Sequence, residues 1–201
     1  SIIGYDAIFF KGGDQWIYYD TYRGTLLEDA VEYVFNNGGV LSGTSAGLHI
    51  LSEVVFTAEH GTVYSEEALE DPFNIYMTLE NDFIPGFSGA VFASHFSERG
   101  RLGRIIGFLG NLDLSEGEEL IGIGVDDKTA FCIDTNRVGT AHGTGAVNLY
   151  HAGSNNTFSI SETRLLASDI EVSQLLNACT VNLNTMAISG FTDYTEPAFS
   201  G

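Results

Sequence analysis

Apolar side chains form two kinds of pattern in the first part of the chain, short unbroken runs and helical spacing, and each pattern predicts a kind of element. Residues 7–10 are an unbroken apolar run, which is typical of a buried strand. From about residue 25 to 36 the apolar positions recur at helical spacing, and Asn37-Gly38-Gly39 ends the predicted helix. Residues 40–41 predict a short strand, and the apolar stretch 48–55 predicts a buried helix.

The rest of the chain continues this alternation of strands and helices. Residues 57–82 are polar and acidic, which predicts an excursion over the surface that could act as a lid. Beyond it we expect a helix at 98–112 and short strands at 90–93, 120–125, 130–133 and 146–150. Residues 151–201 are rich in Ser, Thr and Asn, with one helix-like piece near 169–178. The pattern therefore predicts a single α/β domain over residues 1–201, with a mostly parallel sheet covered on both faces.

The composition is that of a folded, acidic protein. Apolar residues make up 44% of the 201 positions, and 27 acidic residues against 8 basic ones give a net charge of -19. Such a charge repels a nucleic-acid backbone, so we expect no nucleic-acid partner. No apolar run reaches the roughly 18 to 20 residues that span a bilayer, so we expect no membrane partner either.

Three features favour a secreted, processed protein, with a cytoplasmic protein as the alternative. The chain does not begin with Met, lysine is scarce, and Asn155-Asn156-Thr157 is a sequon for glycosylation at Asn155. The predicted strand 7–10 stands at the start of the chain, so we expect a companion fragment of the same precursor to cover its edge. Cys132 and Cys179 form a disulfide or, alternatively, are two small buried side chains.

Gly43-Thr44-Ser45-Ala46-Gly47 has the Gly-x-Ser-x-Gly spacing of a nucleophile elbow. The flanking glycines relieve crowding in a tight turn between a strand and a helix, and this turn exposes the serine hydroxyl above the sheet. The backbone N–H of Ala46 would then face a developing oxyanion. The alternative is a helix cap by Thr44 or Ser45. Because a predicted strand and helix flank the pattern, we predict that Ser45 is a catalytic nucleophile.

A serine nucleophile needs a general base, and His95 is favoured among five histidines by its position. It follows the predicted strand 90–93, at the carboxyl end where sites form in parallel sheets. The alternative for any such histidine is a structural or surface role; His49, for example, is expected to point away from the elbow. Asp126 and Asp127 end another predicted strand, and either of them could orient His95.

The turn Gly12-Gly13-Asp14-Gln15 ends the first predicted strand and faces the same region. It offers a second oxyanion N–H, at Gly13, and a polar side chain for a substrate, at Gln15. The alternative is a simple strand-to-helix turn.

Arg99, Arg101 and Arg104 form a local positive island in an acidic chain. Arg101 and Arg104 are spaced to share a helical face, and they could hold a substrate carboxylate. Ion pairs with nearby acids are the alternative. Metal-ligand and phosphate-loop motifs are missing from the sequence, so we predict neither a metal ion nor a cofactor.

These clusters resemble motifs of the cyanophycinase branch of the S51 serine peptidases, the family that also contains aspartyl dipeptidase, and they follow one another along the chain in the family's order. The His-Phe-x-x-Arg-x-Arg-x-x-Arg piece is a specific motif of the resemblance. Residues 1–150 contain the matching core, and residues 151–201 form a C-terminal extension. The matching pieces are Phe9-Phe10-Lys11-Gly12-Gly13-Asp14-Gln15, Gly43-Thr44-Ser45-Ala46-Gly47, His95-Phe96-Ser97-Glu98-Arg99-Gly100-Arg101-Leu102-Gly103-Arg104 and Gly122-Ile123-Gly124-Val125-Asp126-Asp127-Lys128-Thr129-Ala130.

The resemblance implies an αβα sandwich related to the class I glutamine amidotransferases. It also implies a serine-type peptidase that hydrolyses a peptide or isopeptide bond through an acyl-enzyme on Ser45, with His95 as the base. Asp127 stands where cyanophycinases have a glutamate, so it is the implied third member. Cyanophycinases cleave β-aspartyl-arginine from a polymer of aspartate and arginine. Positions that look substrate-binding in those enzymes match Gln15, Arg99, Arg101 and Arg104.

The chain departs from the family at three places. Ala93-Ser94 replaces the Asp-Gln pair before the histidine, strands that precede the Gly-Gly-Asp-Gln turn are absent, and residues 151–201 have no counterpart. These departures keep open an inactive relative with a binding, storage or structural role. The expected partners are a peptide or isopeptide substrate, the companion fragment and, in an oligomer, a second copy of the chain. A class I amidotransferase proper fits less well, because it uses a cysteine at the elbow.

Overall fold

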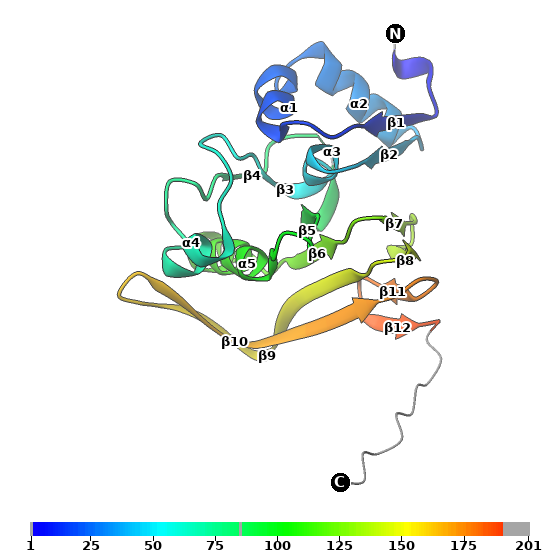
Figure 1. Ribbon diagram of the computed structural model, residues 1–201. Helices are drawn as coiled ribbons and strands as arrows, with labels where there is room; N and C mark the ends of the chain where they lie inside the picture. The colour runs from blue at the N-terminus through cyan, green and yellow to red at the C-terminus, as the bar shows by residue number, and fades with distance from the viewer. Residues whose placement is uncertain (1, 85, 191–201) are drawn as a thin grey trace.

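The computed structural model describes residues 2–84 and 86–190 as a mixed α/β molecule with three sheets and few helices (Figure 1). Its first unit consists of η1 Ile2–Gly4, β1 Ala7–Phe10, α1 Gln15–Tyr22, α2 Leu26–Asn36 and β2 Val40–Gly43. β1 and β2 pair in parallel, with Phe9 opposite Ser42. α2 begins after Thr25, whose hydroxyl accepts a hydrogen bond from the N–H of Leu27 and so caps the helix.

A six-stranded sheet forms the centre of the molecule, in the order β10-β9-β6-β5-β3-β4. Its strands are β3 Ser52–Phe56, β4 Leu79–Glu80, β5 Phe87–Ser94, β6 Ile121–Val125, β9 Val147–Ser161 and β10 Arg164–Leu175. β3, β5 and β6 run parallel, whereas β4, β9 and β10 join antiparallel. The sheet is therefore mixed and not mostly parallel, because β9 and β10 add a long hairpin to it. β9 crosses residue 150, so the predicted core and extension share one sheet.

A smaller antiparallel sheet has the order β12-β11-β8-β7. It is built from β7 Thr129–Ile133, β8 Val138–Gly143, β11 Thr180–Asn182 and β12 Ala187–Ser189. Arg137 ties it to the central sheet. The guanidinium of Arg137 donates to the carbonyl of Ser88 at 3.0 Å and lies over the ring of Phe87 at 4.2 Å.

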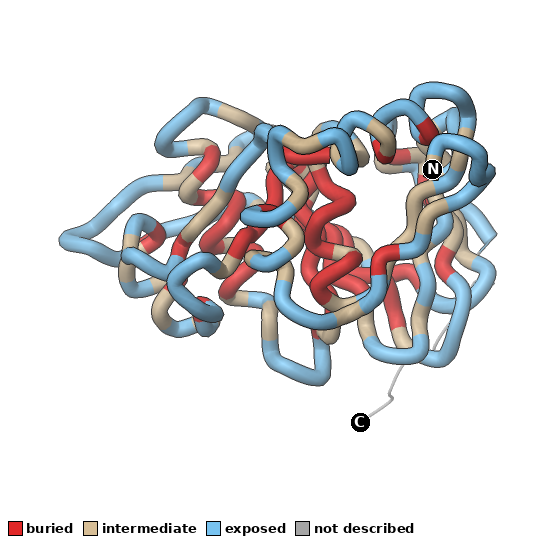
Figure 2. The backbone as a smooth tube through the Cα atoms, turned by 90° about the horizontal axis from the view of Figure 1, so that it is seen from above, coloured by how far each residue is buried: buried red, intermediate tan, exposed pale blue. Residues whose placement is uncertain are grey.

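Three helices pack on or beside the central sheet, namely α3 Ala46–His49, α4 Ser65–Glu70 and α5 Leu102–Glu116. α4 and α5 lie so close that a Cβ built on Gly107 would stand 2.7 Å from the Cβ of Ala68. Buried stretches gather in the middle of the molecule, and exposed turns lie around its outline (Figure 2). None of the helices in the described ranges is long and apolar enough to cross a membrane.

Two predicted helices are wrong. The stretch 48–55 contains the strand β3, because an apolar run of this length does not distinguish a buried strand from a buried helix. The piece near 169–178 belongs to β10, which pairs residue by residue with β9. Residues 57–82 are only partly a surface excursion, because they contain α4, where Ala68 is fully buried. The predicted strands and the helices at 25–36 and 98–112 are confirmed, with shifted ends.

Both alternatives for the cysteines are also wrong. Cys132 and Cys179 are free thiols and form no disulfide, and neither is buried, since Cys132 is exposed and Cys179 is half-buried. Cys132 lies on β7 opposite Thr140 of β8, and β8 pairs on its other side with β11, which begins after Cys179. A whole strand thus separates the two sulfurs, and two strand spacings of about 4.8 Å exceed the reach of a disulfide. Asn155, the predicted glycosylation site, lies in β9, where it is exposed.

The core between α5 and the sheet gives a prediction about stability. Phe108 is fully buried, and its ring centroid lies 4.9 Å from that of Phe56. Phe108→Ala is expected to lower the free energy of unfolding by about 3–5 kcal/mol, because it removes apolar contacts and leaves a cavity. Leu26→Ala, on the exposed side of α2, is the control and should change it by about 0.5 kcal/mol or less. Urea unfolding of both variants measures this, and equal losses would contradict the packing.

Candidate active site

Ser45 lies in a strained turn between β2 and α3. Its φ of 54° and ψ of -119° place a non-glycine residue in a region that costs free energy and needs support from its surroundings. The support comes from close backbone approaches on both sides. A Cβ on Gly43 would stand 2.1 Å from the carbonyl oxygen of Gly47, and a Cβ on Gly47 would stand 2.1 Å from that of Phe10. Only glycine fits at these two positions, so the Gly-x-Ser-x-Gly spacing has a direct steric cause.

The turn after β1 lies against the same serine. A Cβ on Gly12 would approach the Cβ of Ser45 to 3.2 Å, and Gly13 has a φ of 148° that disfavours other residues. Asp14 then caps α1 by accepting a hydrogen bond from the N–H of Trp16, so Gln15 is the first residue of that helix. The predicted oxyanion groups, Gly13 and Ala46, therefore belong to the two segments that flank Ser45.

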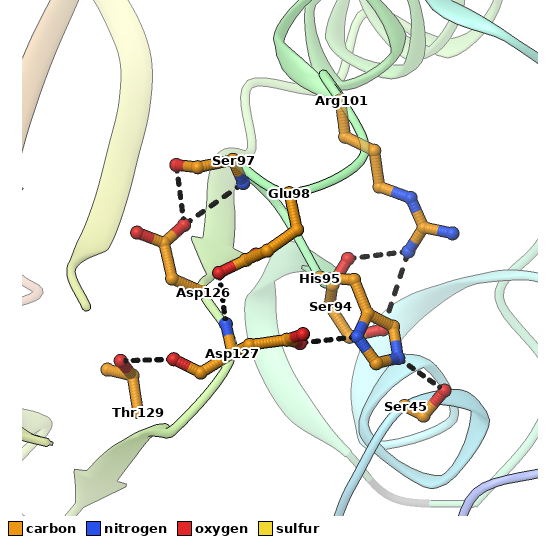
Figure 3. A network of polar contacts seen from close by, with 9 residues as sticks. All are labelled: Ser45, Ser94, His95, Ser97, Glu98, Arg101, Asp126, Asp127 and Thr129. Atoms are coloured by element: carbon orange, nitrogen blue, oxygen red, sulfur yellow. Dashed lines mark hydrogen bonds and ion pairs between the residues drawn. The ribbon is translucent and has the colours of Figure 1, made fainter. Parts of the chain in front are cut away.

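His95 connects Ser45 to Asp127 (Figure 3). The Nε2 atom of His95 lies 2.9 Å from the Oγ of Ser45, and its Nδ1 atom lies 2.5 Å from the Oδ1 of Asp127. His95 follows β5 and Asp127 follows β6, two parallel strands that end side by side with Ser94 opposite Val125. The structure thus brings together the three residues predicted to be catalytic, in the arrangement of nucleophile, base and orienting carboxylate.

Of the two adjacent aspartates, Asp127 is the one that contacts His95. Asp126 turns the other way and accepts hydrogen bonds from Ser97. The N–H of Asp127 donates to the Oε1 of Glu98 at 3.0 Å, which holds its backbone beside the loop that carries the histidine. Glu98 was not among the predicted site residues; its place in the turn after His95 was the only signal for it.

The three arginines occupy different environments. Arg99 is exposed on the turn after β5, whereas the guanidinium of Arg101 donates to the carbonyl of Ser94 at 2.5 Å, next to His95. Burial lowers the pKa of Arg101 to about 10, with a further contribution from the charge of Arg99, so it remains a cation at neutral pH. Within the described ranges, no carboxylate forms an ion pair with any of the three.

Arg104 lies inside the molecule and is only 2% exposed. Its guanidinium carbon stands 5.2 Å from the ring centre of Phe56 and 5.5 Å from that of Phe108, while Nε and Nη2 have no hydrogen-bond partner in the described part of the chain. Burial holds its pKa well below the usual range, and the nearby charge of Arg101 adds to this. Because a guanidinium in a protein hardly loses its proton, Arg104 is a buried cation that no described carboxylate pairs with.

His49 stands one helical turn after Ser45 and is buried, and its Nδ1 atom has no hydrogen-bond partner among the residues that the structure describes. Its ring packs against Phe56 at a centroid distance of 6.2 Å. Burial lowers its pKa well below the usual value, and the charges of Arg104 and Arg101 act in the same direction, so the ring is neutral. His151 lies on β9, and its Nε2 atom is 3.6 Å from the Oε2 of Glu171.

Within residues 2–84 and 86–190, no group of three or more His, Cys, Asp or Glu side chains could hold a metal ion.

Comparison with known proteins shows which kind of fold the chain has. No protein-family model matches the chain. A crystal structure of a peptidase from an acI-B1 Actinobacterium matches it with a TM-score of 0.57 and 18% sequence identity, covering 90% of this chain and 62% of that chain. The protein thus has a peptidase-like fold, and it spans about three-fifths of the length of that peptidase.

The elbow gives a prediction about packing. Gly47→Ala should lower the free energy of unfolding by about 2 kcal/mol or more, because the new methyl group meets the fixed carbonyl of Phe10. Gly4→Ala is the control, since a Cβ at Gly4 has no atom within 4 Å. Differential scanning calorimetry of both variants measures the effect. Equal melting temperatures would mean that the elbow is not held by this contact.

Proposed function

We propose that the protein is a serine-type peptidase that hydrolyses a peptide or isopeptide bond through an acyl-enzyme on Ser45. The main support for this proposal is the pair of contacts from the Oγ of Ser45 to the Nε2 of His95 and from the Nδ1 of His95 to Asp127. The peptidase-like fold supports this reading, and so do the motifs of the cyanophycinase-like S51 family. The proposal includes the αβα sandwich related to class I glutamine amidotransferases.

The contacts assign a role to each member of the triad. With its proton on Nδ1 and held by Asp127, His95 accepts the proton of Ser45 as Oγ attacks the substrate carbonyl. The N–H groups of Gly13 and Ala46 are proposed to stabilise the oxyanion that forms. His95 then protonates the leaving amine, and a water molecule hydrolyses the ester with His95 again acting as the base. Asp127 stays ionised and stabilises the imidazolium form.

Unpaired cations near the triad favour a substrate that carries a carboxylate. Among the described residues, neither Arg101, beside the histidine loop, nor the buried Arg104 forms an ion pair with a carboxylate. A buried charge without a counter-ion is costly, and a ligand carboxylate would relieve that cost. Ala93-Ser94 places no carboxylate next to these arginines. We propose an acidic or β-aspartyl substrate, with Gln15 and Arg99 contributing at the rim.

A companion polypeptide belongs to the same proposal. β1 pairs only with β2 among the described strands, and Phe9 and Val40 on their common face are 64% and 60% exposed. Parallel strands are usually covered on both faces, which supports a further segment, or a second copy, on this side. The exposed sequon at Asn155 supports a secreted, glycosylated protein.

The proposed nucleophile can be tested by covalent labelling. A fluorophosphonate probe is expected to add one label per chain, and intact-mass and peptide spectra should place it on Ser45. Ser45→Ala should abolish the label because it removes the attacking oxygen. Ser42→Ala, three positions earlier on β2, is the control and should label like the unaltered protein. A folded protein that takes up no label would favour an inactive relative with a binding, storage or structural role.

The proposed carboxylate recognition can be tested with paired substrates. Arg101→Ala should raise the KM for a β-aspartyl dipeptide at least about tenfold, since a hydrogen bond to a charged group contributes about 1.5–3 kcal/mol. The KM for the matching amide should change much less. Arg164→Ala, on the exposed part of β10, controls for the change in net charge. Equal losses for the acid and the amide would contradict a role in binding the carboxylate.

A further inference from the structure

Asp126 makes more hydrogen bonds than the aspartate of the triad. Its Oδ1 accepts from the N–H of Ser97 at 3.0 Å, from the hydroxyl of Ser97 at 2.7 Å and from the Nδ2 of Asn148 at 3.3 Å. Its Oδ2 accepts from the N–H of Ala146 at 3.0 Å. One carboxylate therefore joins the turn after β5, the end of β6 and the start of β9. Figure 3 shows it facing Ser97, on the side away from His95.

The turn that Asp126 holds contains a strained residue. His95 has a φ of 46°, which a side chain other than glycine rarely adopts. Such a conformation persists only where the surroundings determine it. Both residues after His95 are fixed to the end of β6: the N–H of Phe96 donates to the carbonyl of Val125 at 3.2 Å, and the N–H of Ser97 donates to Asp126.

We propose that Asp126 is a positioning residue, which holds His95 in the strained turn that keeps its ring between Ser45 and Asp127. This inference rests on the proposed function. A carboxylate suits the place because every hydrogen-bond partner of the Asp126 side chain is a donor, and bonds from such donors to a charged acceptor are the stronger kind. An asparagine would turn an N–H₂ group toward one of these donors, and an alanine would leave all of them unpaired.

The role differs from plain structural support, because it acts on the chemical step and leaves substrate binding alone. Without the anchor at Ser97, His95 can relax from its positive φ, and its ring moves relative to Ser45 Oγ. A misplacement of about 1 Å can cost about 100-fold in rate. Asp126→Ala should therefore lower kcat for a β-aspartyl substrate by about 100-fold, with Asp126→Asn in between and KM little changed in both.

The experiment compares these variants with Asp134→Ala. Asp134 also closes a turn, accepting from the N–H groups of Asn136 and Val138 at 2.9 Å, but this turn joins β7 to β8 and contains no residue of the triad. All proteins are measured for melting temperature, kcat and KM. They are also measured for the downfield proton signal of the His95 Nδ1–H, which Asp127→Ala identifies by its loss. A folded Asp126→Asn protein keeps the test possible if Asp126→Ala fails to fold.

Loss of kcat and of the His95 signal in the Asp126 variants, with both retained in Asp134→Ala at a similar melting temperature, supports the positioning role. Unchanged kcat and an unchanged signal in folded Asp126 variants would overturn it. If the unaltered protein shows the His95 signal but no turnover, the proposed function fails. In that case the signal alone decides the positioning role, so the two failures remain distinguishable.

Discussion

The close approach of three backbone segments around the elbow is the constraint on which the site depends. Gly47 packs on the carbonyl of Phe10, and Gly43 packs on Gly47, so β1, β2 and α3 leave no room for a side chain between them. This contact holds Ser45 at a positive φ and brings the Gly12-Gly13 turn beside it. The turn at Ser45 is thus fixed by close packing, and its strain is supported by the first unit of the fold.

The other half of the site comes from the central sheet. β5 and β6 run parallel and end together, so His95 and Asp127 leave the sheet at the same edge. Two strained positions, Ser45 and His95, then face each other from separate units, and each is held by its own backbone contacts. Around them lies a rare region of positive charge in a chain of net charge -19, where neither Arg101 nor Arg104 forms an ion pair with any described carboxylate. This distribution agrees with an anionic substrate drawn into the site.

Local patterns were sufficient to predict features that have local causes. The helix 26–36 has a capping residue and apolar positions at helical spacing in its own sequence, and the glycines around Ser45 indicate a crowded turn. The stretch 48–55 was wrongly predicted to be a helix. It contains β3, which forms by pairing with β5, and no local pattern in the sequence indicates this pairing. The same holds for β10, whose polar residues become a strand only through pairing with β9.

Side-chain environment was the least predictable part of the site. Residues alone left Asp126 and Asp127 equivalent, and only their turn geometry sends one carboxylate to His95 and the other to Ser97. Arg104 belongs to a motif that looks polar in the sequence, yet it is buried beside the rings of Phe56 and Phe108. Likewise, Cys132 and Cys179 are kept apart by strand order rather than by distance along the chain.

The central claim is that Ser45 attacks a carbonyl whose oxyanion is stabilised by the Gly13 and Ala46 N–H groups. The crystal structure of the protein after inactivation with a phosphonate ester tests it most directly. We expect phosphorus bonded to the Oγ of Ser45, one phosphonyl oxygen within hydrogen-bond reach of both N–H groups, and His95 still in contact with Asp127. A structure with unmodified Ser45, or with the phosphonyl oxygen turned away from both groups, would contradict the claim.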